Sequence, residues 1–253
     1  MAQEAGALLR ERFLEGATAL ASKTTPTDLV SQADFDAERL IRDRLEEARP
    51  DDAVLGEEGG DQSPGNSDGS GLRWVVDPLD GTVNFLFGIP HWGVSVACED
   101  DDGALAGVIH DPMRRETFAA SRSGAPTLDG TAVEASDSEE LATSLVATGF
   151  AYDAEVRGHQ AEVVGRLITV VRDIRRMGSA ALDMAWTACG RHDAYYERAV
   201  QPWDVAAGRL LCERARLEVR WLDSTTLPDD VELPEGILVA PQAIIDELDE
   251  IVR

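Results

Sequence analysis

The chain carries the segment Asp77-Pro78-Leu79-Asp80-Gly81-Thr82 directly after a short apolar run at positions 74–76. The apolar run predicts a buried strand that ends at Asp77. Because the proline stiffens the turn that follows, the carboxylates of Asp77 and Asp80 can point toward one small volume. The segment therefore predicts two cooperating carboxylates at the end of a strand.

The end of the same segment is suited to anion binding. Gly81 and Thr82 begin a predicted helix over residues 82–86, and the first backbone N–H groups of a helix lack partners and attract anions. Carboxylates that can hold a cation beside such a cradle are what phosphoryl chemistry requires.

Two other segments supply carboxylates, Gly56-Glu57-Glu58-Gly59 upstream and Pro202-Trp203-Asp204 far downstream. Each falls where a strand is predicted to end or a helix to begin, so the side chains can converge. A cluster of Asp and Glu without His or Cys partners suits Mg²⁺ or Mn²⁺ and suits zinc or copper poorly. Together, the carboxylates of Glu57, Asp77, Asp80 and Asp204 can hold two cations ~3.5–4 Å apart. One cation would activate water, and the other would stabilise the leaving oxygen.

Each acidic segment also has a plain structural explanation when it is taken alone. Asp-Gly pairs are common in turns, adjacent glutamates are usually solvated, and Asp204 could be a helix N-terminal charge worth ~0.3–1 kcal/mol. A rival motif is the D-x-D-G-T nucleophile segment of haloacid-dehalogenase-like phosphatases. That motif needs aspartates two apart and usually a later lysine. Here the aspartates are three apart, and the single lysine, Lys23, lies upstream.

The composition is strongly acidic, with a formal net charge of −25 over 253 residues. Such a surface repels nucleic acid and anionic membranes, so we expect neither as a partner. Its simplest explanation is a halophilic cytoplasm, where ~1 M salt shortens the Debye length to ~3 Å and screens the self-repulsion. An anionic substrate could then approach only where bound cations reverse the local field.

The cysteines Cys98, Cys189 and Cys212 are odd in number and lie in apolar stretches, which predicts buried free thiols in a reducing cytoplasm. No apolar run approaches the ~20 residues of a membrane span, and no export leader opens the chain. We therefore expect a cytoplasmic protein.

The N-terminal part predicts two helices before the first strand, one with apolar residues spaced from Leu8 to Leu20 and one from the cap Ser31 to Leu45. Positions 59–71 have the composition of a loop. Three strands, at 93–98, 104–110 and 116–120, predict an antiparallel meander.

The C-terminal part predicts an alternating α/β order. After a strand that starts near Thr143, the expected elements are helices at 159–171 and 178–189, a strand at 193–196, a helix at 202–215, strands at 217–222 and 236–240, and a last helix opened by Pro241 at its first position. The charged stretch from Glu134 to Glu140 predicts the seam, which is the boundary between the antiparallel half and the alternating α/β half. We expect residues 1–136 to form an α+β half with the main metal motifs, and residues 137–253 to form an α/β half that supplies Asp204 and substrate-facing residues.

The chain resembles the inositol monophosphatase family of Mg²⁺-dependent, lithium-sensitive phosphatases over nearly its whole length. The matching blocks are K-T-T-P-T-D-L-V at 23–30 with Asp34, G-E-E at 56–58, W-V-V-D-P-L-D-G-T-V-N-F at 74–85, G-V-I-H-D-P at 107–112, G-S-A-A at 178–181, D-A-Y-Y-E at 193–197 and P-W-D-V-A-A-G at 202–208. The resemblance implies a layered α-β-α-β-α sandwich and a homodimer.

The resemblance also implies a metal centre of two or three Mg²⁺ ions, with Mn²⁺ as a substitute. Glu57, Asp77 and the Leu79 carbonyl would hold one ion, and Asp77, Asp80 and Asp204 would hold a second, so that Asp77 bridges them. A weaker third ion would use Glu57 and waters.

The remaining family roles concern water and substrate. Thr82 with Asp34 would orient the attacking water, and Glu57 would assist. The amides of Gly81 and Thr82 would bind phosphate, and the retained Lys23 suggests a role near the anionic site. The residues implied to face the alcohol portion are Asp80, Gly178, Ser179, Ala180, Glu197 and Asp204.

The resemblance implies hydrolysis of inositol monophosphate or a related sugar phosphate by metal-activated water. Fructose 1,6-bisphosphate, 3′-phosphoadenosine nucleotides and histidinol phosphate are alternative substrates, and an RNA-associated regulatory protein is an alternative of another class. Two departures from the family pattern concern turns: residues 213–217 lack the usual glycines, and Asp129 replaces a common asparagine before Gly130.

Overall fold

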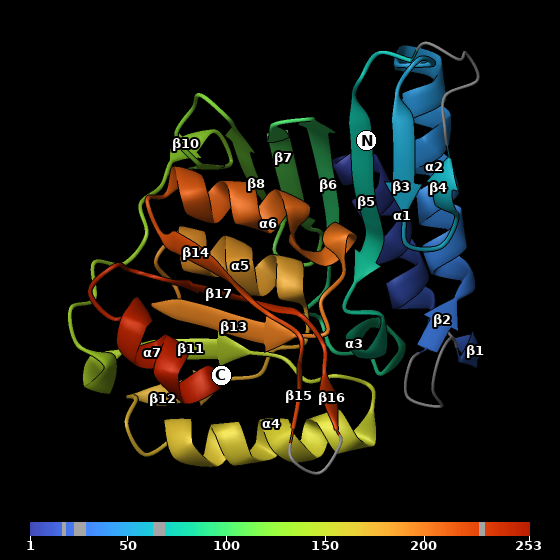
Figure 1. Ribbon diagram of the computed structural model, residues 1–253. Helices are drawn as coiled ribbons and strands as arrows, with labels where there is room; N and C mark the ends of the chain where they lie inside the picture. The colour runs from blue at the N-terminus through green and yellow to red at the C-terminus, as the bar shows by residue number, and fades with distance from the viewer. Residues whose placement is uncertain (17–18, 23–28, 63–68, 228–230) are drawn as a thin grey trace.

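The computed structural model describes residues 1–16, 19–22, 29–62, 69–227 and 231–253, so Lys23 lies outside the described residues. Figure 1 shows five layers in the order helix, sheet, helix, sheet, helix. This is the layered sandwich that the family resemblance implies. No helix within those ranges is long and apolar enough to cross a membrane.

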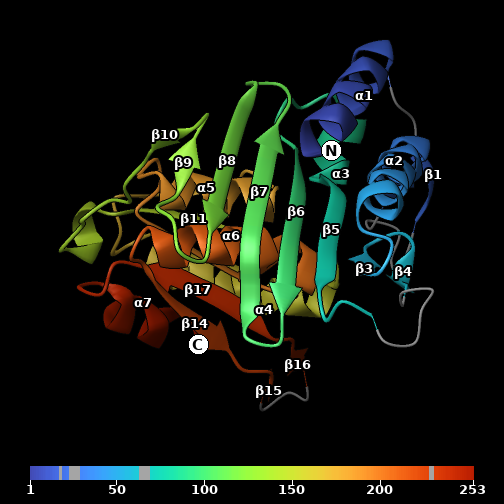
Figure 2. The same ribbon diagram turned by 90° about the horizontal axis from the view of Figure 1, so that it is seen from above.

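The first sheet has eight strands in the order β10-β9-β8-β7-β6-β5-β3-β4. All neighbours run antiparallel except β3 and β5. Its strands are β3 (Ala53–Gly56), β4 (Gly60–Gln62), β5 (Arg73–Asp80), β6 (Gly93–Asp100), β7 (Gly103–Asp111), β8 (Glu116–Ser121), β9 (Thr127–Leu128) and β10 (Thr131–Ala132). Helices α1 (Ala2–Glu15) and α2 (Gln32–Ala48) pack on one face of this sheet, as Figure 2 shows.

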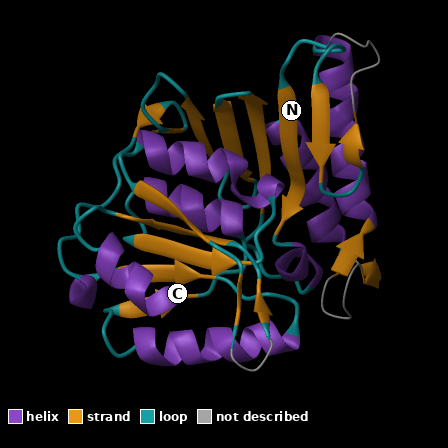
Figure 3. Ribbon diagram, viewed as in Figure 1, coloured by secondary structure: helices purple, strands orange, loops and turns teal. Residues whose placement is uncertain are grey.

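The second sheet has five strands in the order β12-β11-β13-β17-β14 and mixes parallel with antiparallel pairs. Its strands are β11 (Leu145–Thr148), β12 (Asp173–Arg175), β13 (Ala194–Arg198), β14 (Glu218–Leu222) and β17 (Gly236–Ala240). Helices α5 (Ala180–Ala188) and α6 (Pro202–Arg214) lie between the two sheets, while α4 (Ala154–Leu167) and α7 (Ile245–Val252) cover the outer face (Figure 3). The small pieces are α3 (Thr82–Leu86), a 3₁₀ turn at Leu141–Thr143 and the ribbon β15 (Thr225–Thr226) with β16 (Glu232–Leu233).

The middle helical layer joins the two sheets into one core. Eight of the nine residues of α5 are buried, as expected for a helix covered on all sides. One apolar cluster includes Val75 and Ile109 from the first sheet, Leu182 from α5 and Val239 from the second sheet. Each sheet lies on one side of the predicted seam, but the packing between them is continuous; the division into halves remains a prediction.

Several predicted elements are confirmed. The meander strands are β6, β7 and β8, and the short helix after Gly81 is α3. Ser31 caps α2: its side chain accepts from the Ala33 amide, and Asp34 accepts a reciprocal hydrogen bond from the Ser31 amide at 2.9 Å. The three cysteines are free, and Cys98 and Cys212 are buried as predicted, whereas Cys189 is only half-buried.

The prediction that two helices precede the first strand is wrong. Helix α1 ends at Glu15, followed by Gly16 with φ +86°, and the chain then forms β1 (Ala19–Ser22), which pairs with β2 (Leu29–Ser31) before α2 begins. A glycine reaches positive φ without steric cost, so it ends the helix although the apolar spacing continues.

Other element predictions also need correction. Helix α4 begins at Ala154 because Asp153 caps it, and β12 separates α4 from α5 where the sequence analysis expects two successive helices. Pro241 does not open the last helix: its carbonyl accepts from the Ile244 and Ile245 amides in a turn, and α7 starts at Ile245. Part of the predicted 59–71 loop is strand β4.

The two turns that depart from the family pattern keep regular geometry. After α6, Arg216 has φ +67°. The Arg216 amide donates to the Glu213 carbonyl, and the Leu217 amide donates to the Cys212 carbonyl. These hydrogen bonds form a Schellman motif in which arginine takes the usual place of glycine. Asp129 and Gly130 both have positive φ between β9 and β10, and aspartate tolerates that conformation.

Candidate functional site

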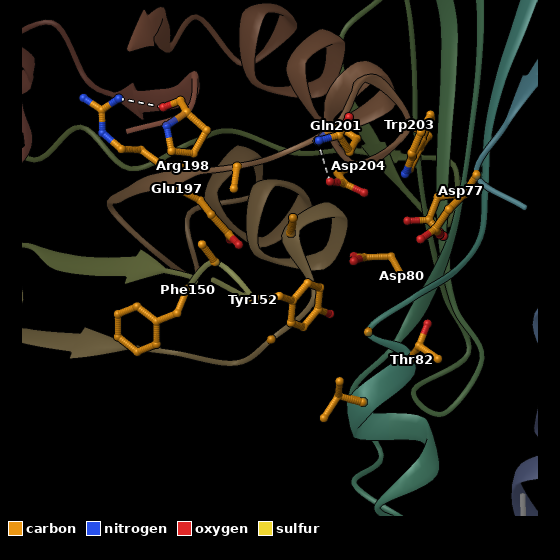
Figure 4. Close-up of a pocket in the computed structure, with 18 of the residues that line it drawn as sticks. Asp77, Asp80, Thr82, Phe150, Tyr152, Glu197, Arg198, Gln201, Trp203 and Asp204 are labelled. Carbon is orange, nitrogen blue, oxygen red and sulfur yellow. Dashed lines mark hydrogen bonds between the residues drawn. The ribbon is translucent and has the colours of Figure 1, made fainter. Parts of the chain in front are cut away.

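A cavity of about 800 Å³ opens beside the end of β5, the starts of α3 and α6, and strand β13. Figure 4 shows Asp77, Asp80, Thr82, Glu197 and Asp204 around this cavity. The predicted site residues that line it are Glu57, Asp77, Leu79, Asp80, Gly81, Thr82, Gly178, Ala180, Glu197 and Asp204. Asp34 and Ser179 are buried and act on lining residues through hydrogen bonds.

The strand that carries Asp77 and Asp80 contains a bulge. Asp77 pairs with Ser95 and Asp80 pairs with Gly93, so β5 has one residue more than β6 between these two pairs. In a regular strand, residues three apart point to opposite faces. The extra residue reverses this alternation and turns both carboxylates toward the cavity, and Pro78, which has no N–H to donate, sits in the bulge. Asp77 is therefore not the last residue of the strand, as the sequence predicts, but the first of the bulge.

Thr82 and Asp34 meet although 48 positions separate them. The Thr82 hydroxyl lies 2.9 Å from Asp34 Oδ1 and 3.0 Å from the Leu79 carbonyl oxygen, so its single proton can go to either acceptor. The other Asp34 oxygen accepts from the Ser31 amide and hydroxyl at the start of α2. The structure thus brings together the two residues that the resemblance assigns to water orientation.

The turn that presents Glu57 is held by Glu38, which the sequence analysis missed. Glu38 Oε2 accepts from the Glu58 amide, Glu38 Oε1 accepts from the Gly59 amide, each at 2.8 Å, and Arg42 pairs with Glu38 at 2.7 Å. A Cβ atom at Gly56 or Gly59 would meet Glu38 Oε1 at 2.5 Å. The glycines around Glu57 therefore make room for this carboxylate, and their paired presence was the only sequence signal for it.

Asp80 ends β5, and its side chain reaches the start of α5. Its Oδ2 accepts from the Ser179 hydroxyl and, at 2.8 Å, from the Ala181 amide. Burial raises the pKa of Asp80 to about 6 although these hydrogen bonds favour the ionised form. Ser179 also caps α5 by accepting from the Leu182 amide, so it positions Asp80 from behind the cavity wall.

Asp204 both caps α6 and lines the cavity. It is the third residue of α6, and its Oδ2 accepts from the Gln201 amide at 2.7 Å in a capping box. Its side chain also lines the cavity, with Asp77 and Asp80 nearby in Figure 4. A helix cap and a cavity carboxylate are therefore compatible here.

The clustered carboxylates disfavour one another's ionisation. Burial raises the pKa of Asp77 well above its usual range, and the negative charges of Glu57, Asp80 and Asp204 raise it further. The pKa of Asp204 is raised by burial first and then by the charge of Asp80. Like charges held in a poorly solvated site create a strong local demand for a cation.

The donor set fits a hard divalent cation, because it consists of carboxylate oxygens and the Leu79 carbonyl. Within the described parts of the chain, no three His, Cys, Asp or Glu side chains are arranged so that they could hold an ion as they stand. The chemistry of the donors and their mutual repulsion support a cation site, and the individual ligands remain predictions.

Gly81 lets the segment after β5 approach the loop before α5 closely. A Cβ at Gly81, where φ is +94°, would meet the Gly178 carbonyl oxygen at 3.1 Å. Asn84, which the sequence analysis did not single out, donates to the carbonyls of His91 and Met177, each at 2.8 Å. These contacts place Gly178 and Ala180 beside the carboxylate cluster, and no side chain caps α3 at Gly81.

Glu197 lies on the part of the lining that the resemblance assigns to the alcohol. The Tyr195 hydroxyl donates to its Oε2 at 2.8 Å, and a Cβ at Gly149 would meet its carboxyl group at about 2.0 Å. Burial raises the pKa of Glu197 to about 7, against the effects of the Tyr195 hydrogen bond and the Arg176 charge. Arginines 157, 176 and 198 and the aromatic residues Phe150, Tyr152 and Trp203 also line the cavity, and none of these was assigned from sequence.

A layered sandwich with an acidic cavity between its sheets defines the class of protein, and comparisons with known proteins agree. The profile described as "Inositol monophosphatase family" matches residues 1–248. The chain belongs to the inositol monophosphatase family.

Individual relatives carry two kinds of name. The "Inositol-1-monophosphatase SuhB" of Mycobacterium tuberculosis is 40% identical over 262 residues, covering 98% of this chain and 89% of that protein. The "Nus factor SuhB" of Xylella fastidiosa is 41% identical over 215 residues, covering 85% of this chain and 76% of that protein. The structure of the extragenic suppressor protein suhB from Bartonella henselae superposes with a TM-score of 0.86 at 32% identity, covering 100% of this chain and 95% of that one.

Proposed function

We propose that this protein is a metal-dependent phosphomonoesterase that hydrolyses inositol monophosphate or a related small sugar phosphate. The observation that carries the proposal is that Glu57, Asp77, Asp80 and Asp204 line one cavity with Thr82, whose hydroxyl is hydrogen-bonded to Asp34. Cation ligands beside a pair of residues that can position water are what direct attack of a metal-activated water on a phosphate ester requires.

The metal ligands in this proposal are those implied by the family. Glu57, Asp77 and the Leu79 carbonyl would hold one ion, and Asp77, Asp80 and Asp204 a second. Bound Mg²⁺ or Mn²⁺ would supply Lewis-acid stabilisation of the phosphate oxygens and lower the pKa of water. The Leu79 carbonyl has a second lone pair, so the Thr82 hydrogen bond does not prevent it from being a ligand.

The chain's own groups have defined tasks in this scheme. The amides of Gly81 and Thr82 bind the phosphate, and the Thr82 hydroxyl, while donating to Asp34, can accept a hydrogen bond from the attacking water. The alcohol portion contacts the 178–180 loop and Glu197 on the other part of the lining. A role for Lys23 near the phosphate is proposed from the motif alone.

The test is phosphate release from inositol 1-phosphate, fructose 1,6-bisphosphate and 3′-phosphoadenosine 5′-phosphate in molar KCl, with Mg²⁺ added or chelated. We expect metal-dependent release and, in a single turnover, incorporation of solvent oxygen into phosphate. Asp101→Asn, an exposed charge change far from the cavity lining, is the control variant. Trapping a covalent phosphoprotein, or release unaffected by chelation, would reject the proposal.

A second candidate is a regulatory role of the kind that the name Nus factor denotes, and it rests on the relative from Xylella fastidiosa. That relationship removes the support for our expectation that the protein has no nucleic-acid partner. Filter binding of RNA in low and molar KCl distinguishes the candidates. Binding that persists in the Asp77→Asn variant would support this role, and absence of binding at both salt concentrations would remove it. The homodimer also stays a prediction, which light scattering can check.

A further inference from the structure

Arginines occupy part of the cavity lining away from the carboxylate cluster. Among the described residues, the basic side chains that line the cavity are Arg157, Arg176 and Arg198. Arg198 is buried and its Nη1 donates to the carbonyls of Asp223 and Pro234. Arg157 Nη1 donates to two carbonyls of the 151–152 segment. These two arginines are therefore partly committed to holding the protein backbone.

Arg176 differs from both because its donors are uncommitted. Within the described residues it forms no hydrogen bond or ion pair, and its guanidinium lies 5.6 Å from the centroid of the Phe150 ring. A cation over an aromatic face gains ~0.5–1 kcal/mol at an exposed site, which favours one position of the side chain without using its N–H groups. All five N–H donors remain available to a ligand.

Gly178 places this guanidinium close to the proposed phosphate cradle. A Cβ atom at Gly178 would lie 2.4 Å from Arg176 Nη1, and a Cβ atom at Gly81 would lie 3.1 Å from the Gly178 carbonyl oxygen. Arg176 and Gly81 thus approach the same residue. One small substrate can touch the cradle at one end and the guanidinium at the other.

The positive charge of Arg176 affects the pKa values of two buried acids. Arg176 lowers the pKa of Glu197 and of Asp183, in both cases against the larger effect of burial. A guanidinium whose only role is to balance these acids would act on every substrate alike. A guanidinium that binds substrate would act only on substrates with a matching anion, and its planar donor fork fits phosphate oxygens.

We propose that Arg176 is a specificity-determining residue that binds a second phosphate group on the alcohol portion of the substrate. The inference rests on the proposed function, because it assumes that the first phosphate reacts at the carboxylate cluster. It changes the substrate expectation from the sequence, which gives fructose 1,6-bisphosphate only as an alternative to a monophosphate. In a chain of net charge −25, such a local cation gives a doubly phosphorylated substrate a favourable contact outside the metal centre.

The test compares fructose 1,6-bisphosphate with fructose 1-phosphate, which has the same ester at C1 but lacks the second phosphate. We expect Arg176→Ala to lower kcat/KM for the bisphosphate roughly 10- to 100-fold, the loss of a charge-assisted hydrogen bond, and to change the monophosphate little. Arg176→Lys should lie between, because it keeps the charge without the fork.

Arg175→Ala is the matched control. Arg175 precedes Arg176, its Nη1 donates to Asp173 at 2.6 Å, and it does not line the cavity. We expect it to leave the ratio of the two substrates unchanged. Equal losses for both substrates in Arg176→Ala would mean that Arg176 acts through Glu197 or the fold, and no loss for either would mean that it is only solvated. Each result overturns the proposal.

A binding measurement separates this proposal from the proposed function. If the wild type hydrolyses neither substrate, the proposed function fails, and calorimetric titration with fructose 6-phosphate then decides on Arg176. Binding that is weakened in Arg176→Ala but retained in Arg175→Ala supports the second phosphate site. Equal binding by both variants, or no binding by the wild type, overturns it.

Discussion

The Thr82 hydroxyl donates to Asp34 Oδ1 at 2.9 Å and so links the start of α3 to the capped start of α2. Both side chains are buried beside the cavity, and Asp34 is fully enclosed. When its proton goes to Asp34, the hydroxyl keeps its lone pairs free to accept a hydrogen bond from water. This geometry suits a residue that orients water rather than one that attacks phosphorus.

We predict that Thr82→Val lowers kcat by roughly 100-fold or more, the range of a lost proton-transfer partner. Thr82→Ser keeps the hydroxyl and should recover most of the activity. Steady-state kinetics and urea denaturation of both variants provide the measurement. If Thr82→Ser is as inactive as Thr82→Val while its stability is normal, the hydroxyl is not the active feature.

Asp77→Asn should reduce activity more than Glu58→Gln does. A bridging ligand serves two cations, so we expect a loss above the 10- to 100-fold that is typical of residues that only support a ligand. Glu58 does not line the cavity and should be less important. Kinetics and Mg²⁺ titration calorimetry test the ranking. The metal-free Asp77→Asn protein should be no less stable than the wild type, because the substitution removes one of the repelling charges; equal activity losses would contradict the assignment.

Arg216→Gly should stabilise the protein by about 0.5–1 kcal/mol. A residue with a Cβ at φ +67° is strained, and glycine relieves this strain at some cost in unfolded-state entropy. Arg209 lies at an exposed position inside α6, the helix that precedes Arg216, and Arg209→Gly should instead lower the free energy of unfolding by about 1 kcal/mol. Denaturant midpoints in molar KCl measure both changes, and a loss in both variants would show that the turn stores no strain.

The stability of the metal-free protein should depend on Glu197. Its pKa is raised from 4.5 to about 7 by burial, so the folded protein binds this proton more tightly than the unfolded chain does. The free energy of unfolding should therefore decrease as pH rises through that window. Glu197→Gln should remove this part of the slope. The difference between the wild-type and variant unfolding curves at several pH values is the measurement, and parallel curves would rule out the effect.

Salt should act on folding and on activity in different ways. Molar KCl should stabilise the fold by screening the net charge of −25. Lithium should inhibit at much lower concentration, as the family resemblance implies, by taking a catalytic cation position. Matched Li⁺ and Na⁺ titrations at constant ionic strength separate these effects, and coincident inhibition curves would remove the lithium claim.

Local patterns predicted most of the fold correctly. The meander strands, the cap at Ser31 and the short helix after Gly81 depend on neighbours in the chain, so alternation, capping and turn chemistry are sufficient to predict them. The errors lie where local signals compete. Gly16 ended a helix whose apolar spacing continued, and Pro241 was compatible with both a turn and a helix start.

The sequence by itself determined which residue types can hold a cation and where the glycines must lie. Only the tertiary structure decided how they combine. The bulge that turns Asp77 and Asp80 to one side depends on pairing with β6, and the Glu38 carboxylate that shapes the Glu57 turn comes from a different helix. Arg176 reaches the cavity only because Gly178 leaves space for its guanidinium. These features arise from contacts between segments far apart in the chain, and local propensity carries no information about such contacts.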